Sequence, residues 1–215
     1  MLHNKITVWD TATGQVVRTL KGHKNGVNCI ISLKRDMLAS GSNDYSIIIW
    51  DVNTGHQLYT LTGHAYWIYA LAELADDQLA SGSADSTIKI WNLNTGKEIS
   101  TLKGHYWSVR TLLALPNNKL ASGSFETIRI WNTLTGRLIQ KLEGHNDWVN
   151  SLSLLRNGFM MASASNDKTI ILWNISNGNL IKIFKGHTGH VNSLALLQDN
   201  RLASCSADES IIIWK

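Results

Sequence analysis

The sequence is poor in charged residues and in proline, and each shortage excludes a class of protein. Charged residues make up 17% of its 215 residues and hydrophobic residues 44%, a balance typical of a folded chain and not of a disordered one. The one proline, Pro116, leaves no proline-rich linker that could divide the chain. We therefore expect a single domain over residues 1–215.

Cysteine and long apolar runs are scarce as well. Cys29 and Cys205 stand far apart and match no metal-ligand spacing, so we interpret both as small buried side chains in a reducing compartment, without a disulfide. No apolar run approaches the roughly 18 residues of a membrane span. The opening residues MLHNKITVWD lack the apolar core of a signal peptide. These features predict a cytoplasmic or nuclear protein without a membrane segment.

Positive charge is present but dispersed. The formal net charge is +4, and the lysines and arginines are scattered along the chain instead of forming a run. Three lysines precede Gly-His pairs, at Lys21, Lys103 and Lys185. They could attract an acidic partner or could simply be solvated. The dispersion argues against a dedicated nucleic-acid-binding arm.

An internal repeat dominates what is there. Gly-His pairs begin at positions 22, 63, 104, 144 and 186, in steps of 41, 41, 40 and 42 residues, and tryptophans keep the same period. Aliphatic runs bounded by turn residues predict four short strands in each unit. In the first unit these are Val27–Leu33, Met37–Gly41, Ser46–Trp50 and Gln57–Leu61.

Two kinds of turn residue recur. Asp44, Asp85, Asp167 and Asp208 fall between the second and third strands, where a carboxylate can accept hydrogen bonds from nearby backbone N–H groups. A glycine follows each tryptophan by a few residues and can adopt a positive φ between the third and fourth strands. These glycines are Gly55, Gly96, Gly136 and Gly178.

The combined pattern resembles the WD40 family of β-transducin-like repeats over the whole chain. Its elements are Gly-His, then Leu-Ala-Ser-Gly-Ser-x-Asp, then Ile-x-Ile-Trp. The resemblance implies an all-β propeller of four-stranded blades. The units are a partial repeat at 1–20, full repeats at 21–61, 62–102, 103–142 and 143–184, and a last repeat at 185–215 that lacks its outer strand. The unmatched ends suggest part of a larger, seven-bladed propeller, or a partial ring completed by another copy.

The resemblance also assigns the repeated polar residues to a structural hydrogen-bond network inside each blade. That network comprises His23, Asp44, Trp50, His64, Asp85, Trp91, His105, Trp131, His145, Asp167, Trp173, His187, Asp208 and Trp214. The third unit departs from the pattern because its turn is one residue shorter, and there we expect Glu126 to replace the aspartate. Three Trp-Asn pairs replace Trp-Asp, a change that keeps an acceptor oxygen and that the fold should tolerate.

Function is expected where the units differ from one another. By the resemblance, the residue three after each Gly-His histidine lies on the top rim of the propeller, and the residue two further on shares its side of the strand. Aromatic, Arg and Asn side chains gather at these and adjoining positions, and such residue types dominate binding hot spots. The predicted partner-binding residues are Trp67, Tyr69, Trp107, Arg110, Phe125, Trp148, Asn150, His190 and Asn192, with Tyr66 and Tyr106 beside them. Packing between blades is the alternative role.

We therefore predict a non-catalytic scaffold that binds a peptide or a partner domain on this rim. Binding of nucleic acid or another polyanion through stacking aromatics beside Arg110 is the alternative. An enzyme is disfavoured because no nucleophile and base pair breaks the repeat. His187 and His190 come nearest to a metal-binding pair, yet no carboxylate or cysteine partner recurs beside them. No metal and no cofactor are expected.

Overall fold

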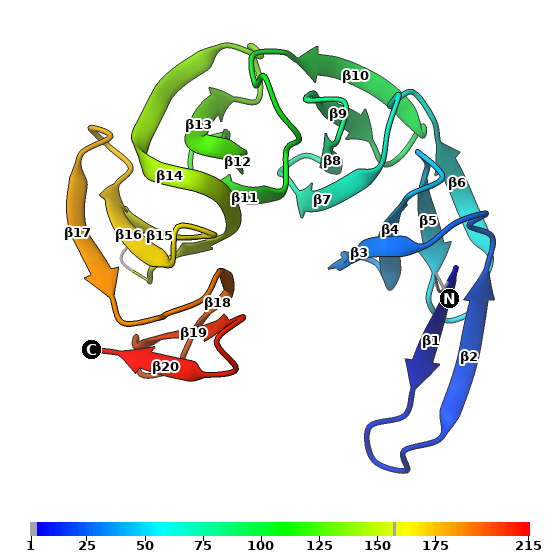
Figure 1. The fold of residues 1–215 in the computed structure, drawn as a ribbon. Helices are drawn as coiled ribbons and strands as arrows, with labels where there is room; N and C mark the ends of the chain where they lie inside the picture. The colour runs from blue at the N-terminus through cyan, green and yellow to red at the C-terminus, as the bar shows by residue number, and fades with distance from the viewer. Residues whose placement is uncertain (1–3, 157) are drawn as a thin grey trace. The chain divides into compact units, whose positions relative to one another are not determined.

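The computed structural model describes residues 4–156 and 158–215, and in these residues all regular structure is β-strand (Figure 1). The expected all-β fold of four-stranded repeats is confirmed. The chain divides into two compact units, residues 1–104 and 105–215, which are described separately. Residues 1–3 of the predicted partial repeat lie outside the described residues.

The first unit contains three antiparallel sheets, which follow one another along the chain. One is a hairpin and two have four strands, each in sequence order. The strands are β1 (Lys5–Trp9) and β2 (Val16–Lys21), then β3 (Val27–Leu33), β4 (Met37–Ser42), β5 (Ile47–Asp51) and β6 (Gln57–Leu61), then β7 (Ile68–Glu73), β8 (Gln78–Ser83), β9 (Ile88–Asn92) and β10 (Lys97–Leu102).

The second unit contains a seven-stranded antiparallel sheet, β11 to β17, and a three-stranded sheet, β18 to β20. The larger sheet comprises β11 (Thr111–Leu115), β12 (Lys119–Gly123), β13 (Phe125–Asn132), β14 (Leu138–Leu154), β15 (Met160–Ser165), β16 (Thr169–Asn174) and β17 (Leu180–Lys185). The smaller comprises β18 (Val191–Leu196), β19 (Leu202–Ser206) and β20 (Ile211–Trp214). The expectation of short strands fails at β14, a single strand of 17 residues that serves two repeats.

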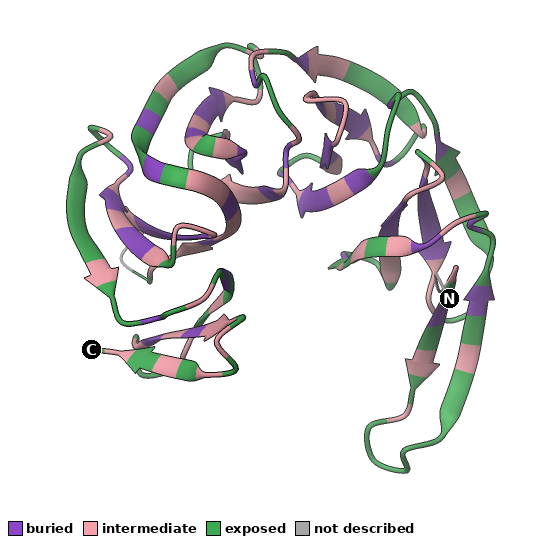
Figure 2. Ribbon diagram, in the orientation of Figure 1, coloured by how far each residue is buried: buried purple, intermediate pink, exposed green. Residues whose placement is uncertain are grey.

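Burial explains why the third strand of a repeat is the most apolar. In β5 the run Ile47–Trp50 is buried on both faces, as a strand covered on both sides requires. The fourth strands β6, β10 and β17 are instead largely exposed (Figure 2). Apolar side chains of adjacent repeats belong to common core clusters, for example Ile49 and Leu79 in the first unit and Ile130 and Met161 in the second.

The turns use the residues that the sequence predicts. The four glycines after the tryptophans have φ between 68° and 79°, the left-handed conformation that glycine adopts without a steric penalty. The residue after each tryptophan accepts backbone hydrogen bonds whether it is Asp or Asn. Asp51 Oδ1 accepts from Thr54 N at 2.8 Å, and Asn92 Oδ1 accepts from Thr95 N at 2.9 Å. The exchange of Asp for Asn therefore preserves the turn.

Cys29 and Cys205 are both free thiols, and they are half-buried instead of buried as expected. Cys29 lies on β3, where half-buried positions alternate with exposed ones, and Cys205 lies on β19 next to half-buried Ser206. In the described part of the chain, no helix has the length and apolar character needed to cross a membrane.

Candidate functional site

Four side chains, His, Ser, Asp and Trp, form a hydrogen-bond network inside the repeats. In the repeat that ends the first unit, Trp91 Nε1 donates to Ser81 Oγ at 2.8 Å. Ser81 Oγ lies 2.8 Å from His64 Nε2, and His64 Nδ1 lies 2.7 Å from Asp85 Oδ2. The same contacts recur in three further sets, namely His23, Ser40, Asp44 and Trp50; His145, Ser163, Asp167 and Trp173; and His187, Ser204, Asp208 and Trp214.

The aspartate is the main acceptor of this network. Asp85 Oδ2 also accepts from the backbone N–H of Ala65 at 2.9 Å, and Asp85 Oδ1 accepts from Thr87 Oγ1 at 2.7 Å. Burial raises the pKa of Asp85, but the hydrogen bonds from His64, Thr87 and Ala65 together outweigh it and hold that pKa well below its ordinary value. The carboxylate is therefore ionised and fixes the histidine, the turn and the strand entry together.

The Gly-His glycine is required by the network's own tryptophan. A Cβ atom on Gly144 would lie 3.0 Å from Cη2 of Trp173, and one on Gly186 would lie 3.0 Å from Cη2 of Trp214. Since real Cβ contacts are rarely this close, a larger residue would require the indole to shift by a few tenths of an ångström.

The third repeat keeps only part of the network. Trp131 Nε1 donates to Ser122 Oγ at 2.8 Å, and Ser122 Oγ lies 2.7 Å from His105 Nε2. Among the described residues, however, none forms a hydrogen bond with His105 Nδ1, although that atom is buried. Burial, and secondarily the charge of Arg129, lowers the pKa of His105 to about 3, so its imidazole is neutral at physiological pH.

The short turn of this repeat explains the loss. In the complete turns the residue after the aspartate has a positive φ, as Ser86 does at 66°, and Glu126 has the matching φ of 60°. Glu126 therefore corresponds to Ser86, and the aspartate position itself is deleted. The expectation that Glu126 replaces the aspartate is wrong, because Glu126 is exposed and makes no contact with His105 Nδ1.

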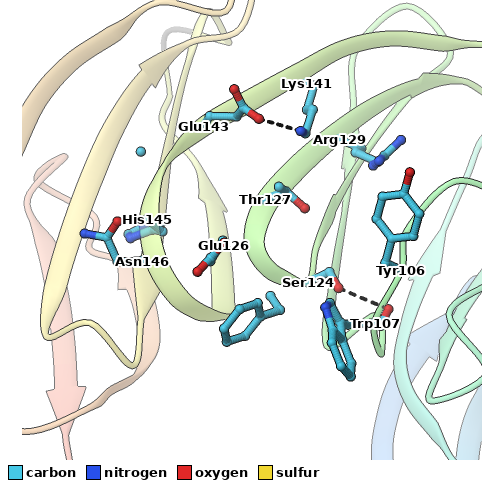
Figure 3. Close-up of a pocket in the computed structure, with 12 residues that line it drawn as sticks. Tyr106, Trp107, Ser124, Glu126, Thr127, Arg129, Lys141, Glu143, His145 and Asn146 are labelled. Carbon is cyan, nitrogen blue, oxygen red and sulfur yellow. Dashed lines mark hydrogen bonds and ion pairs between the residues drawn. The ribbon is translucent and has the colours of Figure 1, made fainter.

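The deletion also reshapes the neighbouring strand. Phe125 pairs with Trp148 and Thr127 pairs with Glu143, so that β14 is continuous but bows away from β13 between these two positions. A cavity of about 420 Å³ lies at the bow (Figure 3). Its lining includes Tyr106, Trp107, Phe125, Glu126, Thr127, Arg129, Lys141, Glu143 and Asn146.

Four of the predicted partner-binding side chains lie together beside this cavity. The Phe125 ring lies 6.1 Å from the Trp107 ring and 5.3 Å from the Trp148 ring, in edge-to-face arrangements. The Arg110 guanidinium carbon stands 3.9 Å from the centroid of Trp148, a cation–π geometry. We call Trp107, Arg110, Phe125 and Trp148 the aromatic cluster. Trp107 is 59% exposed, and the adjacent Tyr106 is 87% exposed.

The remaining predicted binding residues are placed differently. In the first unit Trp67 and Tyr69 form a pair of their own, with ring centroids 6.2 Å apart. In the second unit His190 and Asn192 are exposed. Asn150 makes a contact that the sequence did not indicate, because its Nδ2 donates to Asn166 Oδ1 at 2.7 Å and to the carbonyl of Val191 at 3.0 Å. The hydrogen bond to Val191 thus links β14 to β18.

Sequence reasoning missed Arg129 and Thr127 as members of the site. The signal for Thr127 was the shortened turn, which removes the carboxylate that the equivalent Thr87 and Thr169 contact elsewhere. The residue equivalent to Arg129 is Lys89, which pairs with Glu98 and not with the turn aspartate. The pair His187 and His190 does not form a metal site, because both ring nitrogens of His187 are hydrogen-bonded, to Asp208 and Ser204. Within the described residues, no group of three or more His, Cys, Asp and Glu side chains could hold a metal ion.

These features define a class of repeat protein, built from four-stranded antiparallel units that share a His, Ser, Asp and Trp network. The family model described as WD domain, G-beta repeat matches residues 14–51, 55–92, 96–132, 136–174 and 178–215. The chain belongs to the WD40 repeat family, as its sequence indicated. Domains of this family are generally non-catalytic and typically serve as protein-interaction scaffolds. A search of curated proteins found no match.

Proposed function

We propose that the chain is a scaffold that binds a peptide or a partner domain, and that the aromatic cluster of the second unit is its principal contact surface. The observation that carries the proposal is the exposure of Trp107 and Tyr106 next to an arginine stacked on Trp148. Trp, Tyr and Arg are enriched among the residues that supply most of the affinity at protein interfaces. Trp and Tyr in particular bury a large area with few freely rotating bonds. Membership of a family that generally binds proteins supports the same function.

Packing between repeats accounts for only part of the cluster. Phe125 and Trp148 are half-buried and contact each other, whereas more than half of the Trp107 side chain is open to solvent. An exposed indole contributes little to folding but gains hydrophobic free energy when a partner covers it. The cluster thus presents an exposed aromatic surface that a partner could cover.

A peptide selection tests the proposal. A random peptide library displayed on phage would be enriched on the chain, and the affinity of the recovered peptides measured by calorimetry. We expect Trp107→Ala to weaken binding about 30-fold, equivalent to about 2 kcal/mol. The matched control is Phe159→Ala, which removes another exposed aromatic of the same unit. The proposal fails if Trp107→Ala has no effect or if both variants lose affinity equally.

A further inference from the structure

The aspartate of a complete repeat occupies a place defined by its donors. In the fourth repeat, Asp167 Oδ2 accepts from His145 Nδ1 at 2.7 Å and from the backbone N–H of Asn146 at 3.0 Å. Asp167 Oδ1 accepts from Thr169 Oγ1 at 2.6 Å. These three donors surround one carboxylate. In the third repeat the equivalent donors are His105 Nδ1, the backbone N–H of Tyr106 and Thr127 Oγ1, and among the described residues His105 Nδ1 has no hydrogen-bond partner.

His105 is left with a donor that has no acceptor. The 2.7 Å contact between Ser122 Oγ and His105 Nε2 equals that of the complete repeats. In the complete repeats Nδ1 faces the carboxylate and donates to it, and we assign the same tautomer to the neutral ring of His105, with its proton on Nδ1. His105 is only 7% exposed. A buried N–H without a partner destabilises the fold, and an incoming acceptor would remove that cost.

Arg129 supplies a second buried donor without a partner among the described residues, at the cavity itself. Arg129 follows Thr127 by two residues on β13 and lines the cavity, and within the described part of the chain its buried Nε has no hydrogen-bond partner. Its positive charge adds to the effect of burial in lowering the pKa of the His105 imidazole. Lys141 also lines the cavity but already pairs with Glu143 (Figure 3).

We propose that this cavity binds the carboxylate of an Asp or Glu side chain from a protein partner, which supplies in trans the acceptor that the third repeat lacks. The inference deepens the proposed scaffold function and rests on it. Arg129 provides the charge, and Thr127 and the Tyr106 backbone provide the hydrogen bonds that a carboxylate receives in the other repeats. Trp107 and Phe125 line the same cavity and belong to the aromatic cluster. An acidic residue flanked by apolar ones therefore suits the whole surface.

Charge around the cavity favours a carboxylate over a phosphate. Glu126 and Glu143 line it together with Arg129 and Lys141, so that the formal charges of the lining cancel. A singly charged carboxylate can pair with Arg129 at little repulsive cost, whereas the two charges of a phosphate would meet both glutamates. Removing one glutamate should accordingly strengthen carboxylate binding.

Nuclear magnetic resonance of the histidine side chains detects carboxylate binding through the chemical shift of His105 Nδ1. The full chain, labelled with ¹⁵N at histidine, would be titrated with the blocked tripeptide acetyl-Gly-Asp-Gly-amide and with its Asn counterpart. We expect the Asp peptide to shift the Nδ1 resonance of His105 and to leave that of His64 in place, because His64 already has Asp85. The Asn peptide should shift neither resonance.

Variants identify the groups responsible. Arg129→Gln should lower the affinity for the Asp peptide at least tenfold. Glu126→Gln should raise that affinity severalfold. Lys89→Gln is the matched control, since Lys89 holds the equivalent strand position in the first unit and pairs with Glu98. Inserting an aspartate between Phe125 and Glu126 would restore the complete turn. That variant should move the His105 resonance to the shifted position without peptide and should abolish peptide binding.

The outcomes separate this inference from the scaffold function. A His105 shift that the Asn peptide also produces, or that Arg129→Gln leaves unchanged, would overturn the carboxylate site. A stronger response to inorganic phosphate than to the Asp peptide would overturn the choice of ligand. If phage-selected peptides depend on Trp107 but are indifferent to Arg129→Gln, the scaffold function stands and the carboxylate site fails. If the Asp peptide binds but no selected peptide depends on Trp107, the carboxylate site stands and the proposed role of the aromatic cluster in the scaffold function fails.

Discussion

The serine of each network is the residue on which the whole set depends. Ser81 accepts from Trp91 and contacts His64, and all three side chains are buried. A hydroxyl is the smallest side chain that accepts one hydrogen bond and donates another, which is why an alanine or a valine of similar size cannot substitute for it. The chain therefore pairs a buried indole N–H and a buried imidazole through a single oxygen atom.

Removing that oxygen leaves two buried polar groups without partners. We expect Ser81→Ala to lower the free energy of unfolding by about 2 to 4 kcal/mol, as measured by urea denaturation. Ser100→Ala, a substitution of a half-buried serine on the outer strand β10, should change it by less than about 0.5 kcal/mol. Equal effects of the two variants would show that the network contributes nothing specific.

His105 gives the protein a stability that depends on pH in a defined window. Its folded pKa is about 3, below the value of about 6.5 in an unfolded chain. Between these two pH values the unfolded chain binds a proton that the folded chain does not, so stability falls as the pH falls below about 6.5. By pH 5 the loss attributable to this group should reach about 2 kcal/mol.

The variant His105→Gln should flatten this part of the stability profile, as followed by urea denaturation at several pH values. His64→Gln, in a repeat whose aspartate is present, should keep the slope. A profile of the wild-type chain that is flat between pH 5 and 7 would contradict the assignment of a neutral, unpaired His105.

At the scale of elements, β14 is where the third repeat departs from the others. Deletion of one turn residue lets Phe125 pair directly with Trp148, and the outer strand of one repeat continues into the inner strand of the next. Contacts from β14 then reach the last sheet. Besides the bond from Asn150, Ser151 Oγ accepts from the backbone N–H of Leu194 at 3.1 Å. The long strand is the element that links the repeats of the second unit.

The variant Asn150→Ala should loosen β18 without unfolding the rest of the unit. Loss of the hydrogen bond to Val191, worth about 1 kcal/mol, should speed amide hydrogen exchange in β18 about fivefold. Asn28 makes the equivalent bond to the carbonyl of Ile68 in the first unit, at 3.0 Å. Asn28→Ala should therefore speed exchange in β7 and leave β18 unchanged. Faster exchange in β18 with both variants would contradict this local role.

At the scale of the whole molecule, the dispersed charge argues against polyanion binding. The net charge of +4 comes from 20 basic and 16 acidic residues distributed along the chain. The aromatic cluster contains one arginine, and the cavity beside it has equal numbers of both signs. Apolar contact and a single ion pair, instead of counterion release, should therefore dominate partner binding.

Salt dependence tests this expectation. Between about 50 and about 200 mM salt, the affinity for a phage-selected peptide should change less than about fivefold, whereas a protein that makes 6 to 10 phosphate contacts loses roughly a thousandfold or more. Fluorescence anisotropy with a labelled peptide and with a labelled single-stranded oligonucleotide would measure both. Tight, steeply salt-sensitive binding of the oligonucleotide would favour the polyanion alternative.

The sequence by itself determined the repeat, the strand type and the place of each turn, because these follow from local chemistry that recurs with a fixed period. Positive φ at Gly55 and an acceptor at Asn92 could be predicted, since each depends on residues only a few positions away. The tertiary structure alone decided which donors were left unpaired. Whether Glu126 could reach His105 depended on backbone φ, and whether Asn150 would face solvent or Val191 depended on a neighbouring strand. Contacts between side chains distant in sequence follow from packing, which no periodicity records.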